Sequence, residues 1–304
     1  MGVLNVTPDS FSDGGRHESV DAAVARALEM VSEGADVIDV GGESTRPGAV
    51  VVDPVREQRR VLPVLDAIAE SCARAGVRLS IDTRNESTAR AAVAGGVTLI
   101  NDVAATLWTV AAELGVGWVA MHMLGDPTTM QARPSYGDVV SEVGAFLRDR
   151  VDRARAAGVT EVWADPGIGF GKTTAHNLAL LARLDELVES DTPVVVGTSR
   201  KRSLGVLAAR SDAGLVAHPG PTGGDAVFDV VEPVPMEDRL TGSLNTASWA
   251  MIVGARMVRV HDVGDTVRAA AVVAASGSPT ASRSATAPRT EAVSATEVPA
   301  TEEV

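Results

Sequence analysis

The sequence predicts an α/β fold: a (β/α)8 TIM barrel over residues 1–275, followed by a disordered tail at 276–304. Eight short apolar runs alternate with longer segments of helical spacing. The runs are continuous rather than polar at every second residue, which is typical of parallel strands covered on both faces. A barrel needs about 250 residues, which this chain supplies. An open doubly wound sheet is the alternative, but it would more often stop at about five or six strands.

The predicted strands and helices alternate along the chain. Strands are expected at 2–6, 36–40, 77–81, 97–100, 117–121, 161–164, 193–196 and 257–260. Amphipathic spacing predicts helices at 20–32, 54–75, 139–157, 177–189, 240–253 and 265–274. Residues 211–235 contain HPGPTGG and EPVP, which predict a long surface excursion. After Ser276 the chain is rich in Ala, Thr, Ser, Pro and Glu and shows neither helical nor strand periodicity, which predicts the disordered tail.

The charge and composition restrict the classes of partner. The chain has 27 Lys and Arg against 40 Asp and Glu, a net charge of −13. This charge argues against nucleic acid or a membrane surface as a partner. No apolar run approaches the ~18 residues of a membrane helix, and no signal-peptide pattern opens the chain. The single cysteine, Cys72, cannot form an internal disulfide. We therefore expect a cytoplasmic protein whose anionic ligands need a local basic pocket.

Polar side chains gather where the predicted strands end. In a barrel the active site lies at the C-terminal ends of the strands. A single Asp or Asn there often only caps the next helix, but polar residues at nearly every strand end favour a site. They are Asn5, Asp39, residues 43–46, Asp82, Asn101, Asp102, His122, Asp165, residues 199–201, Arg259 and His261.

The segment DPGIGFGKTT, residues 165–174, ends like a nucleotide-binding P-loop at Gly171, Lys172 and Thr173. A P-loop also needs a glycine about five positions earlier, where this chain has Pro166. Nucleotide hydrolysis is therefore disfavoured. We interpret the segment as a strand end whose glycines let the backbone pass closely by a flat ligand while Asp165 points inward.

Cations and histidines predict an anion site. Lys201 follows the seventh predicted strand, and Arg259 with His261 belongs to the eighth, a region where barrels often bind phosphate. His122 lies between methionines, so we interpret it as structural. No two histidines have the spacing of zinc ligands, whereas magnesium held mainly by substrate phosphates and one Asn needs no such cluster.

Eight separated blocks together resemble one family, the dihydropteroate synthases of bacterial folate synthesis, from Met1 to about Val272. The blocks are MGVLNVTPDSFSDGG, DVGGESTRPGA, SIDTR, ND at Asn101, MHM, DPGIGFGK, GTSRK and RVHDV. The resemblance implies a pterin-binding transferase. It would condense 7,8-dihydropterin-6-ylmethyl diphosphate with 4-aminobenzoate to give 7,8-dihydropteroate and pyrophosphate.

The resemblance also implies the roles of individual residues. Pterin binding falls to Asp82, Asn101, Val103, Met121, Asp165, Phe170 and Lys201. Aminobenzoate binding falls to Phe11, Thr45, Arg46, Pro47, Phe170 and Ser199. Pyrophosphate binding falls to Asn5, Arg46, Arg259 and His261, and the Mg²⁺ cofactor would be held by Asn5. The catalytic residues would be Asp82, Lys201, Arg259 and His261, with Asp82 stabilising a cationic dihydropterin after pyrophosphate leaves.

Further implications of the resemblance concern loops and partners. Residues 7–15 and 43–47 would close over the substrates, the protein would be a homodimer, and it would be a sulfonamide target. Ala104, Ala105 and Thr106 stand where the family commonly has a glycine-rich turn. Two alternatives remain: a non-catalytic pterin-binding paralogue, and a pterin-dependent methyltransferase domain. The paralogue is disfavoured because Asn5, Asp82, Lys201, Arg259 and His261 are all present. The methyltransferase domain would not need the SRK and RVH residues for pyrophosphate.

Deletion of everything after Ser276 is expected to leave the melting temperature and the activity almost unchanged. A segment of this composition cannot bury enough apolar surface to stabilise the barrel. Thermal denaturation of the full and shortened chains tests this, and a large drop in melting temperature would show that the tail packs on the barrel.

Overall fold

The computed structural model describes residues 1–6, 16–44, 52–126, 129–132, 134–215, 228 and 231–277, with residues 16–19 described as backbone only. The loop predicted at 7–15, most of the second loop and most of the excursion at 211–235 lie outside these residues. The tail from 278 onward also lies outside them.

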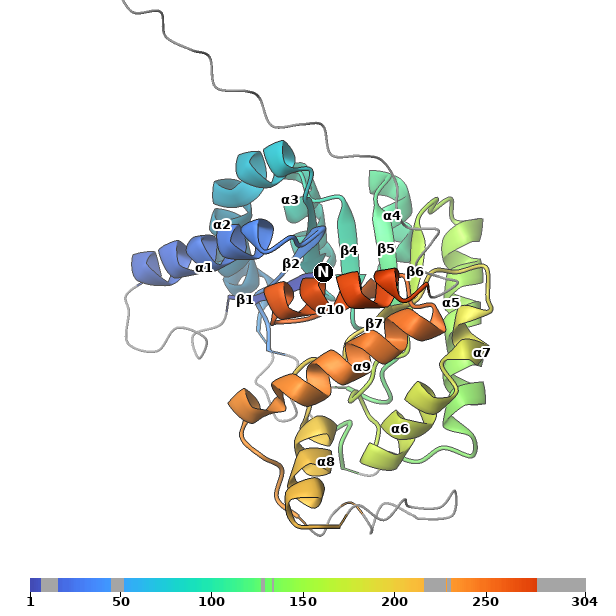
Figure 1. Ribbon diagram of the computed structural model, residues 1–304. Helices are drawn as coiled ribbons and strands as arrows, with labels where there is room; N and C mark the ends of the chain where they lie inside the picture. Colours follow the sequence, from blue (N-terminus) through green and yellow to red (C-terminus); the bar gives the residue numbers. More distant parts are fainter. Residues whose placement is uncertain are drawn as a thin grey trace, which may run out of the picture.

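The described residues form eight parallel strands. These strands close into a barrel (Figure 1). They are β1 (Gly2–Asn5), β2 (Val37–Gly41), β3 (Arg78–Asp82), β4 (Leu99–Asp102), β5 (Gly117–Met121), β6 (Val162–Asp165), β7 (Val195–Val196) and β8 (Met257–Val258). Strands β1 to β6 pair in chain order, and β7 pairs with β8. Parallel bridges join Ala164 to Val194 and Gly2 to Val260, which link the two sheets at both edges. The predicted (β/α)8 barrel is therefore confirmed.

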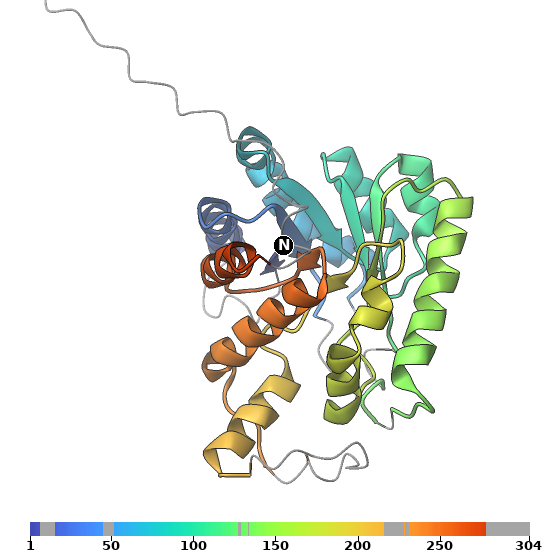
Figure 2. The same ribbon diagram turned by 45° about the vertical axis from the view of Figure 1, so that its right-hand side comes forward.

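Helices surround the strands (Figure 2). They are α1 (Arg16–Ser32), α2 (Pro54–Ala75), α3 (Glu86–Ala94), α4 (Trp108–Leu114), α5 (Val139–Ala156), α6 (Thr174–Ala182), α7 (Asp185–Val188), α8 (Arg202–Asp212), α9 (Leu240–Val253) and α10 (Val263–Ala275), with a 3-10 turn η3 (Met236–Arg239) before α9. Helix α2 shows why such segments begin and end where they do. The Asp53 side chain accepts a hydrogen bond from the Arg56 N–H, Pro54 occupies the first turn, and Gly76 ends the helix at φ 69°.

The single helix predicted at 177–189 is wrong in one respect, because the segment is split into α6 and α7. Arg183 leaves the helical conformation at φ −115°. Its guanidinium donates to Asp138 at 3.0 Å and to Glu186 Oε1 at 2.6 Å. The break thus coincides with a contact to a residue far away in the sequence.

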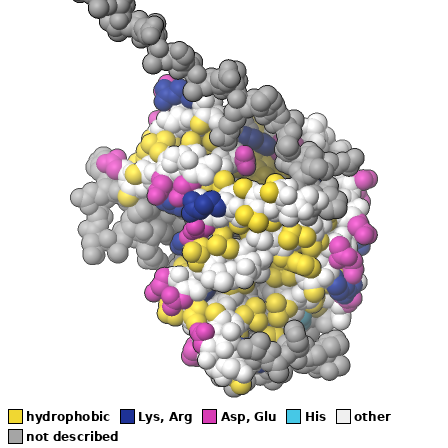
Figure 3. All heavy atoms as spheres, in the orientation of Figure 1, with side chains coloured by type: hydrophobic (Ala, Val, Ile, Leu, Met, Phe, Trp, Pro, Cys, Tyr) yellow, Lys and Arg dark blue, Asp and Glu magenta, His cyan; other side chains and the backbone are white. Residues whose placement is uncertain are grey.

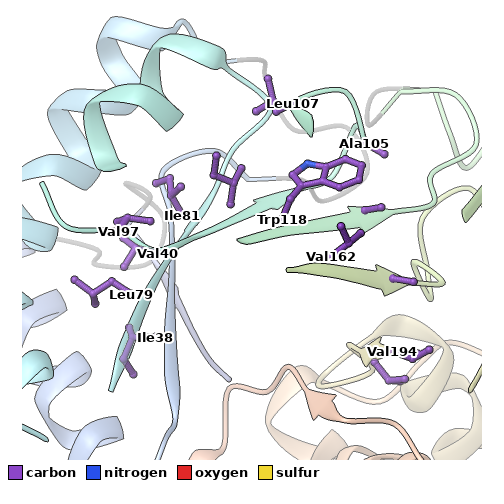
Figure 4. Packing of buried hydrophobic residues seen from close by; sticks show 14 of the residues in the cluster. Ile38, Val40, Leu79, Ile81, Val97, Ala105, Leu107, Trp118, Val162 and Val194 are labelled. Atoms are coloured by element: carbon purple, nitrogen blue, oxygen red, sulfur yellow. The ribbon is translucent and has the colours of Figure 1, made fainter. Parts of the chain in front are cut away.

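Most of the core lies between the strands and the helices, and it is aliphatic, as the low aromatic content requires (Figure 4). Ile38 and Val40 of β2, with Ile81 of β3, contribute fully buried side chains to it. Trp118 is the large aromatic exception, and its Nε1 donates to Asp102 at 3.2 Å. A second apolar cluster lies inside the barrel and consists of Met1, Val37, Leu99, Val119 and Val195.

A charged pair lies at the N-terminal end of the barrel. Arg78, the first residue of β3, donates from Nη1 and Nη2 to the two carboxylate oxygens of Glu161 at 2.7 and 2.9 Å. Trp163 Nε1 donates to the same carboxylate at 2.8 Å. A Cβ at Gly117 would lie 2.7 Å from Glu161 Oε2, so the glycine makes room for the carboxylate. In this fold the active site lies at the opposite, C-terminal end of the strands.

None of the helices among the described residues combines the length and the apolarity needed to cross a membrane.

Replacing Leu99 by Ala is expected to lower the free energy of unfolding by about 2–5 kcal/mol, because it opens a cavity in the interior cluster. Leu99 is 0% exposed. Urea denaturation measures the change. Val55→Ala is the control, since Val55 of α2 is 58% exposed and its truncation should change stability by no more than about 0.5 kcal/mol. Equal losses in the two variants would contradict the assignment of the inner core.

Candidate active site

A polar layer lies directly above the apolar cluster inside the barrel. Successive side chains of a strand point to opposite faces, so the next inward residue follows two positions later. Val37 is thus followed by Asp39, Leu99 by Asn101, and Met257 by Arg259. Asp39 and Asn101 are buried, and the Arg259 side chain is only 10% exposed. The layer therefore brings ionisable and hydrogen-bonding groups together inside the barrel.

Arg259 lies at the centre of this layer. Its Nη1 donates to Asn101 Oδ1 at 3.1 Å, and its Nη2 lies 3.1 Å from Asp165 Oδ2 and 3.9 Å from Met121 Sδ. A Cβ at Gly197 would lie 3.2 Å from Nη2, so this glycine makes room for the guanidinium. The structure thus gathers three of the predicted pterin ligands around the predicted pyrophosphate ligand.

Asp165 offers an acceptor to the site. Its Oδ1 accepts a hydrogen bond from the Gly167 N–H at 2.7 Å. Its Oδ2 is buried and, within the described part of the chain, forms the ion pair with Arg259 but accepts no hydrogen bond. This oxygen can therefore accept a hydrogen bond from a ligand N–H group.

Asp82 and Asn5 lie on the two sides of Gly41. The parallel register pairs Asn5 with Gly41 and Gly41 with Asp82. A Cβ at Gly41 would lie 3.5 Å from Asp82 Oδ2 and 3.7 Å from Asn5 Oδ1. Burial, and then the negative charge of Asp39, raises the pKa of Asp82 well above its usual value. A positive charge forming beside Asp82 would therefore favour the ionised carboxylate.

Lys201 and Phe170 form a contact at the mouth of the barrel. Lys201 Nζ lies 4.3 Å from the centroid of the Phe170 ring and donates to the Ile168 carbonyl. Burial, together with the positive charge of Arg259, lowers the pKa of Lys201 to about 7. Val103, another predicted wall residue, is buried just after β4.

The loops after β7 and β8 are tied together. Ser199 Oγ lies 3.0 Å from His261 Nδ1 and accepts from the His261 backbone N–H at 3.1 Å. In the neighbouring positions Arg200 forms an ion pair with Asp262. The structure thus brings the predicted aminobenzoate residue Ser199 into contact with the predicted pyrophosphate residue His261.

The ammonium of Lys172 holds the glycine-rich loop after β6 against the loop after β5. It lies 2.9 Å from His122 Nδ1, and it donates to the carbonyls of Gly167, Phe170 and His122 at 3.0, 3.1 and 3.3 Å. Burial and the Lys172 charge lower the pKa of His122 to about 3, so this histidine is neutral. These contacts of the Lys172 ammonium agree with a structural role for His122. In a P-loop the lysine ammonium would contact phosphate, whereas here it is engaged by the protein itself.

The glycines of this loop serve a different purpose from the one expected. A Cβ at Gly167, where φ is 63°, would lie 1.9 Å from the His122 carbonyl oxygen. A Cβ at Gly171, where φ is 62°, would lie 2.6 Å from the Leu124 carbonyl oxygen. Close approach to the chain's own backbone, rather than to a ligand, therefore explains these two glycines.

Some predicted residues fall outside the described ranges, and one buried residue has contacts that the sequence pattern does not predict. Phe11, Thr45, Arg46 and Pro47 lie outside the described residues. The sequence places Asp39 among the polar residues of the strands and predicts no ligand contact for it, although its position inside the apolar run VIDVG indicates a buried acceptor. Across the described ranges no three His, Cys, Asp or Glu side chains form a metal-binding cluster.

The fold and this polar interior define a barrel with buried hydrogen-bonding groups at the C-terminal ends of its strands, where enzymes of this fold have their active sites. The chain belongs to the pterin binding enzyme family, which it matches over residues 1–261. It is 42% identical to the dihydropteroate synthase of Escherichia coli, over 91% of this chain and 90% of that protein.

Two solved structures of a dihydropteroate synthase are also similar to this chain. The Xanthomonas albilineans dihydropteroate synthase with 4-aminobenzoic acid superposes with a TM-score of 0.77 at 43% identity, covering 91% of this chain and 92% of that one. The Xanthomonas albilineans enzyme in complex with 7,8-dihydropteroate gives a TM-score of 0.74 at 41% identity, with the same coverage of both chains.

Gly167→Ala is expected to destabilise the protein and to weaken pterin binding, because the new Cβ would force the loop carrying Phe170 away from His122. Gly96→Ala is a matched control: Gly96 also has a positive φ, 99°, but a Cβ there meets nothing within 4 Å. The control should lose only the ~1–2 kcal/mol of a left-handed residue. Denaturation and pterin titration compare the two, and equal behaviour would contradict the close-approach explanation.

Proposed function

We propose that this protein is a dihydropteroate synthase, which joins the amine of 4-aminobenzoate to the methylene carbon of 7,8-dihydropterin-6-ylmethyl diphosphate. The observation that carries the proposal is the buried Asp165 Oδ2, which can accept a hydrogen bond beside Asn101 and Arg259. The similar dihydropteroate synthase of Xanthomonas albilineans, solved once with 4-aminobenzoic acid and once with 7,8-dihydropteroate, supports it.

The pterin is proposed to lie in the polar layer. Its edge of N–H donors suits acceptors on Asp82, Asn101 and Asp165, and its carbonyl suits Lys201. Val103, Met121 and Phe170 would contact its faces. The diphosphate would extend from Arg259 in the polar layer toward Asn5, Arg46 and His261 nearer the rim. Aminobenzoate would contact Phe170, Ser199 and the residues Phe11, Thr45, Arg46 and Pro47.

The reaction breaks the bond between the methylene carbon and the diphosphate oxygen. The electron pair leaves with diphosphate, and positive charge spreads into the dihydropterin ring. Asp82 would stabilise this cation, and the amine nitrogen would then attack the methylene carbon and release its proton. An aryl amine is already neutral at pH 7, so no strong general base is needed.

The donor chemistry of the site is compatible with Mg²⁺. Asn5 supplies an amide oxygen at the strand end beside Asp82, and hard cations prefer oxygen ligands. We propose that Asn5 and the diphosphate oxygens hold the ion, which would neutralise charge on the leaving group. Asn5 would thereby also fix the diphosphate near the rim.

An apolar face supports the proposed homodimer. Figure 3 shows hydrophobic side chains gathered over α9 and α10. Trp249 and Ile252 of α9 are each 46% exposed, and Val267 and Val272 of α10 are exposed as well. Such a patch is typical of a protein interface.

Analytical ultracentrifugation should show a dimer that Ile252→Glu converts to a monomer; a monomeric wild type would contradict this part of the proposal.

Two further parts of the proposal concern setting and inhibition. Cys72 is a free buried thiol, which is compatible with the reducing cytoplasm. A sulfonamide resembles 4-aminobenzoate in shape and charge, so it should compete for the aminobenzoate site.

The decisive test uses the purified protein with the pterin diphosphate, 4-aminobenzoate and Mg²⁺. Pyrophosphate release that depends on the amine, with formation of dihydropteroate, is the expected result. Pterin binding without turnover would instead indicate the non-catalytic paralogue.

Asp82→Asn should lower turnover by roughly 100-fold or more, the scale of losing one preorganised electrostatic contact. The amide keeps the shape and much of the hydrogen bonding but removes the charge, so pterin affinity should fall less than turnover. Calorimetric titration without amine and steady-state rates provide the comparison. Equal losses would indicate plain recognition, and wild-type turnover would remove Asp82 from the mechanism.

A further inference from the structure

The carboxylate of Asp39 is buried inside the barrel and has no place among the residues proposed to contact the substrates. It lies in the middle of β2 and is 2% exposed. Ser80 Oγ donates to its Oδ1 at 2.7 Å, and Asn101 Nδ2 donates to its Oδ2 at 2.8 Å. Both oxygens are therefore engaged by side chains from the neighbouring strands β3 and β4, and the group acts purely as an acceptor.

This acceptor decides how the Asn101 amide is oriented. An amide has an acceptor at one end and a donor at the other, and its orientation follows from its partners. With Nδ2 facing Asp39, Oδ1 faces Arg259 Nη1 at 3.1 Å. The opposite orientation would direct the NH₂ group at a guanidinium and the carbonyl oxygen at a carboxylate. Both contacts would be repulsive, so Asp39 and Arg259 together permit one orientation.

The hydrogen bonds between Asp39 and Asn101 and between Asn101 and Arg259 also hold the Arg259 guanidinium in place. Burial works against its charge, but Asp165, Asp39 and Asp82 outweigh burial, so the pKa of Arg259 is raised. Asn101 Oδ1 receives one guanidinium nitrogen and Asp165 pairs with the other. Loss of the Asn101 orientation would therefore free one side of the guanidinium.

We propose that Asp39 is a positioning residue: its carboxylate fixes the Asn101 amide and, through Asn101, places the Arg259 guanidinium for the pterin diphosphate. The inference rests on the proposed function, because that function makes Asn101 and Arg259 substrate ligands. Asp39 itself touches neither substrate.

Asp39→Asn tests the proposal, with Ser80→Ala as the matched control. An amide at position 39 has one acceptor and cannot accept from both Ser80 and Asn101 in the present way. KM for the pterin diphosphate should rise by about 10-fold or more, the scale of losing a supporting hydrogen bond to a ligand residue. KM for 4-aminobenzoate should stay close to wild type. Ser80→Ala removes the other hydrogen bond to the same carboxylate but keeps Asn101 in place, so its KM values should stay close to wild type.

A double-mutant cycle separates positioning from general stabilisation. If Asp39 acts through Asn101, then Asp39→Asn should add less than about threefold to the defect in pterin affinity when Asn101 is already Ala. Effects that multiply would show that Asp39 acts independently of Asn101 and would overturn the proposal. Equal KM values for Asp39→Asn and Ser80→Ala would overturn it as well.

Binding measurements keep this test separate from the test of the reaction. Calorimetric titration with 6-hydroxymethylpterin measures the pterin affinity, which depends on the Asn101 orientation, and it does not require synthase activity. A wild type without synthase activity would therefore contradict only the proposed function. If Asp39→Asn does not fold, Asp39→Ser is the second variant, since it is smaller and leaves room for water. Unchanged pterin affinity in a folded variant, or failure of both variants to fold, would overturn the positioning role.

Discussion

The interior of this barrel is organised around one buried guanidinium. A guanidinium cannot lose its proton in a protein, so burying Arg259 requires acceptors and space at the same depth. Asn101 on β4 and Asp165 on β6 supply the acceptors, and Gly197 after β7 supplies the space. These residues come from different strands. The strands must therefore be staggered so that all three residues lie within reach of the Arg259 side chain.

Inward-pointing side chains follow one another two residues apart along each strand. One such side chain packs in the apolar cluster, and the next belongs to the polar layer of the site. Leu99 belongs to the apolar cluster, and Asn101, two residues later, belongs to the polar layer. The Arg78 and Glu161 pair lies at the N-terminal end of the same barrel. Substitutions in the lower part of the barrel should therefore affect mainly stability, whereas substitutions in the polar layer should affect mainly ligand binding.

The sequence predicted the barrel because the strand signal is local: continuous apolar runs followed by polar residues. The features that it did not predict depend on partners far along the chain. The break at Arg183 coincides with contacts to Asp138, 45 residues earlier. The role of Asp39 depends on Ser80 and Asn101, 41 and 62 residues away. The roles of individual site residues came from resemblance to a family, because spacing alone identifies a strand end but not the ligand bound there.

The carboxyl groups of the site lie deeper than Lys201 and His261, and Arg259 lies among those carboxyl groups, which reconciles an acidic protein with an anionic substrate. The carboxyl groups of Asp39 and Asp165 lie buried in the polar layer, and Asp82 ends β3 beside it. Lys201 and His261 follow later strands, on the loops nearer the rim. In the proposed reaction a cation forms on the pterin while diphosphate departs. The carboxyl groups would stabilise the cation where it forms, and the rim would receive the anion. The two products of bond breaking would thus be drawn in opposite directions, which opposes their recombination before the amine attacks.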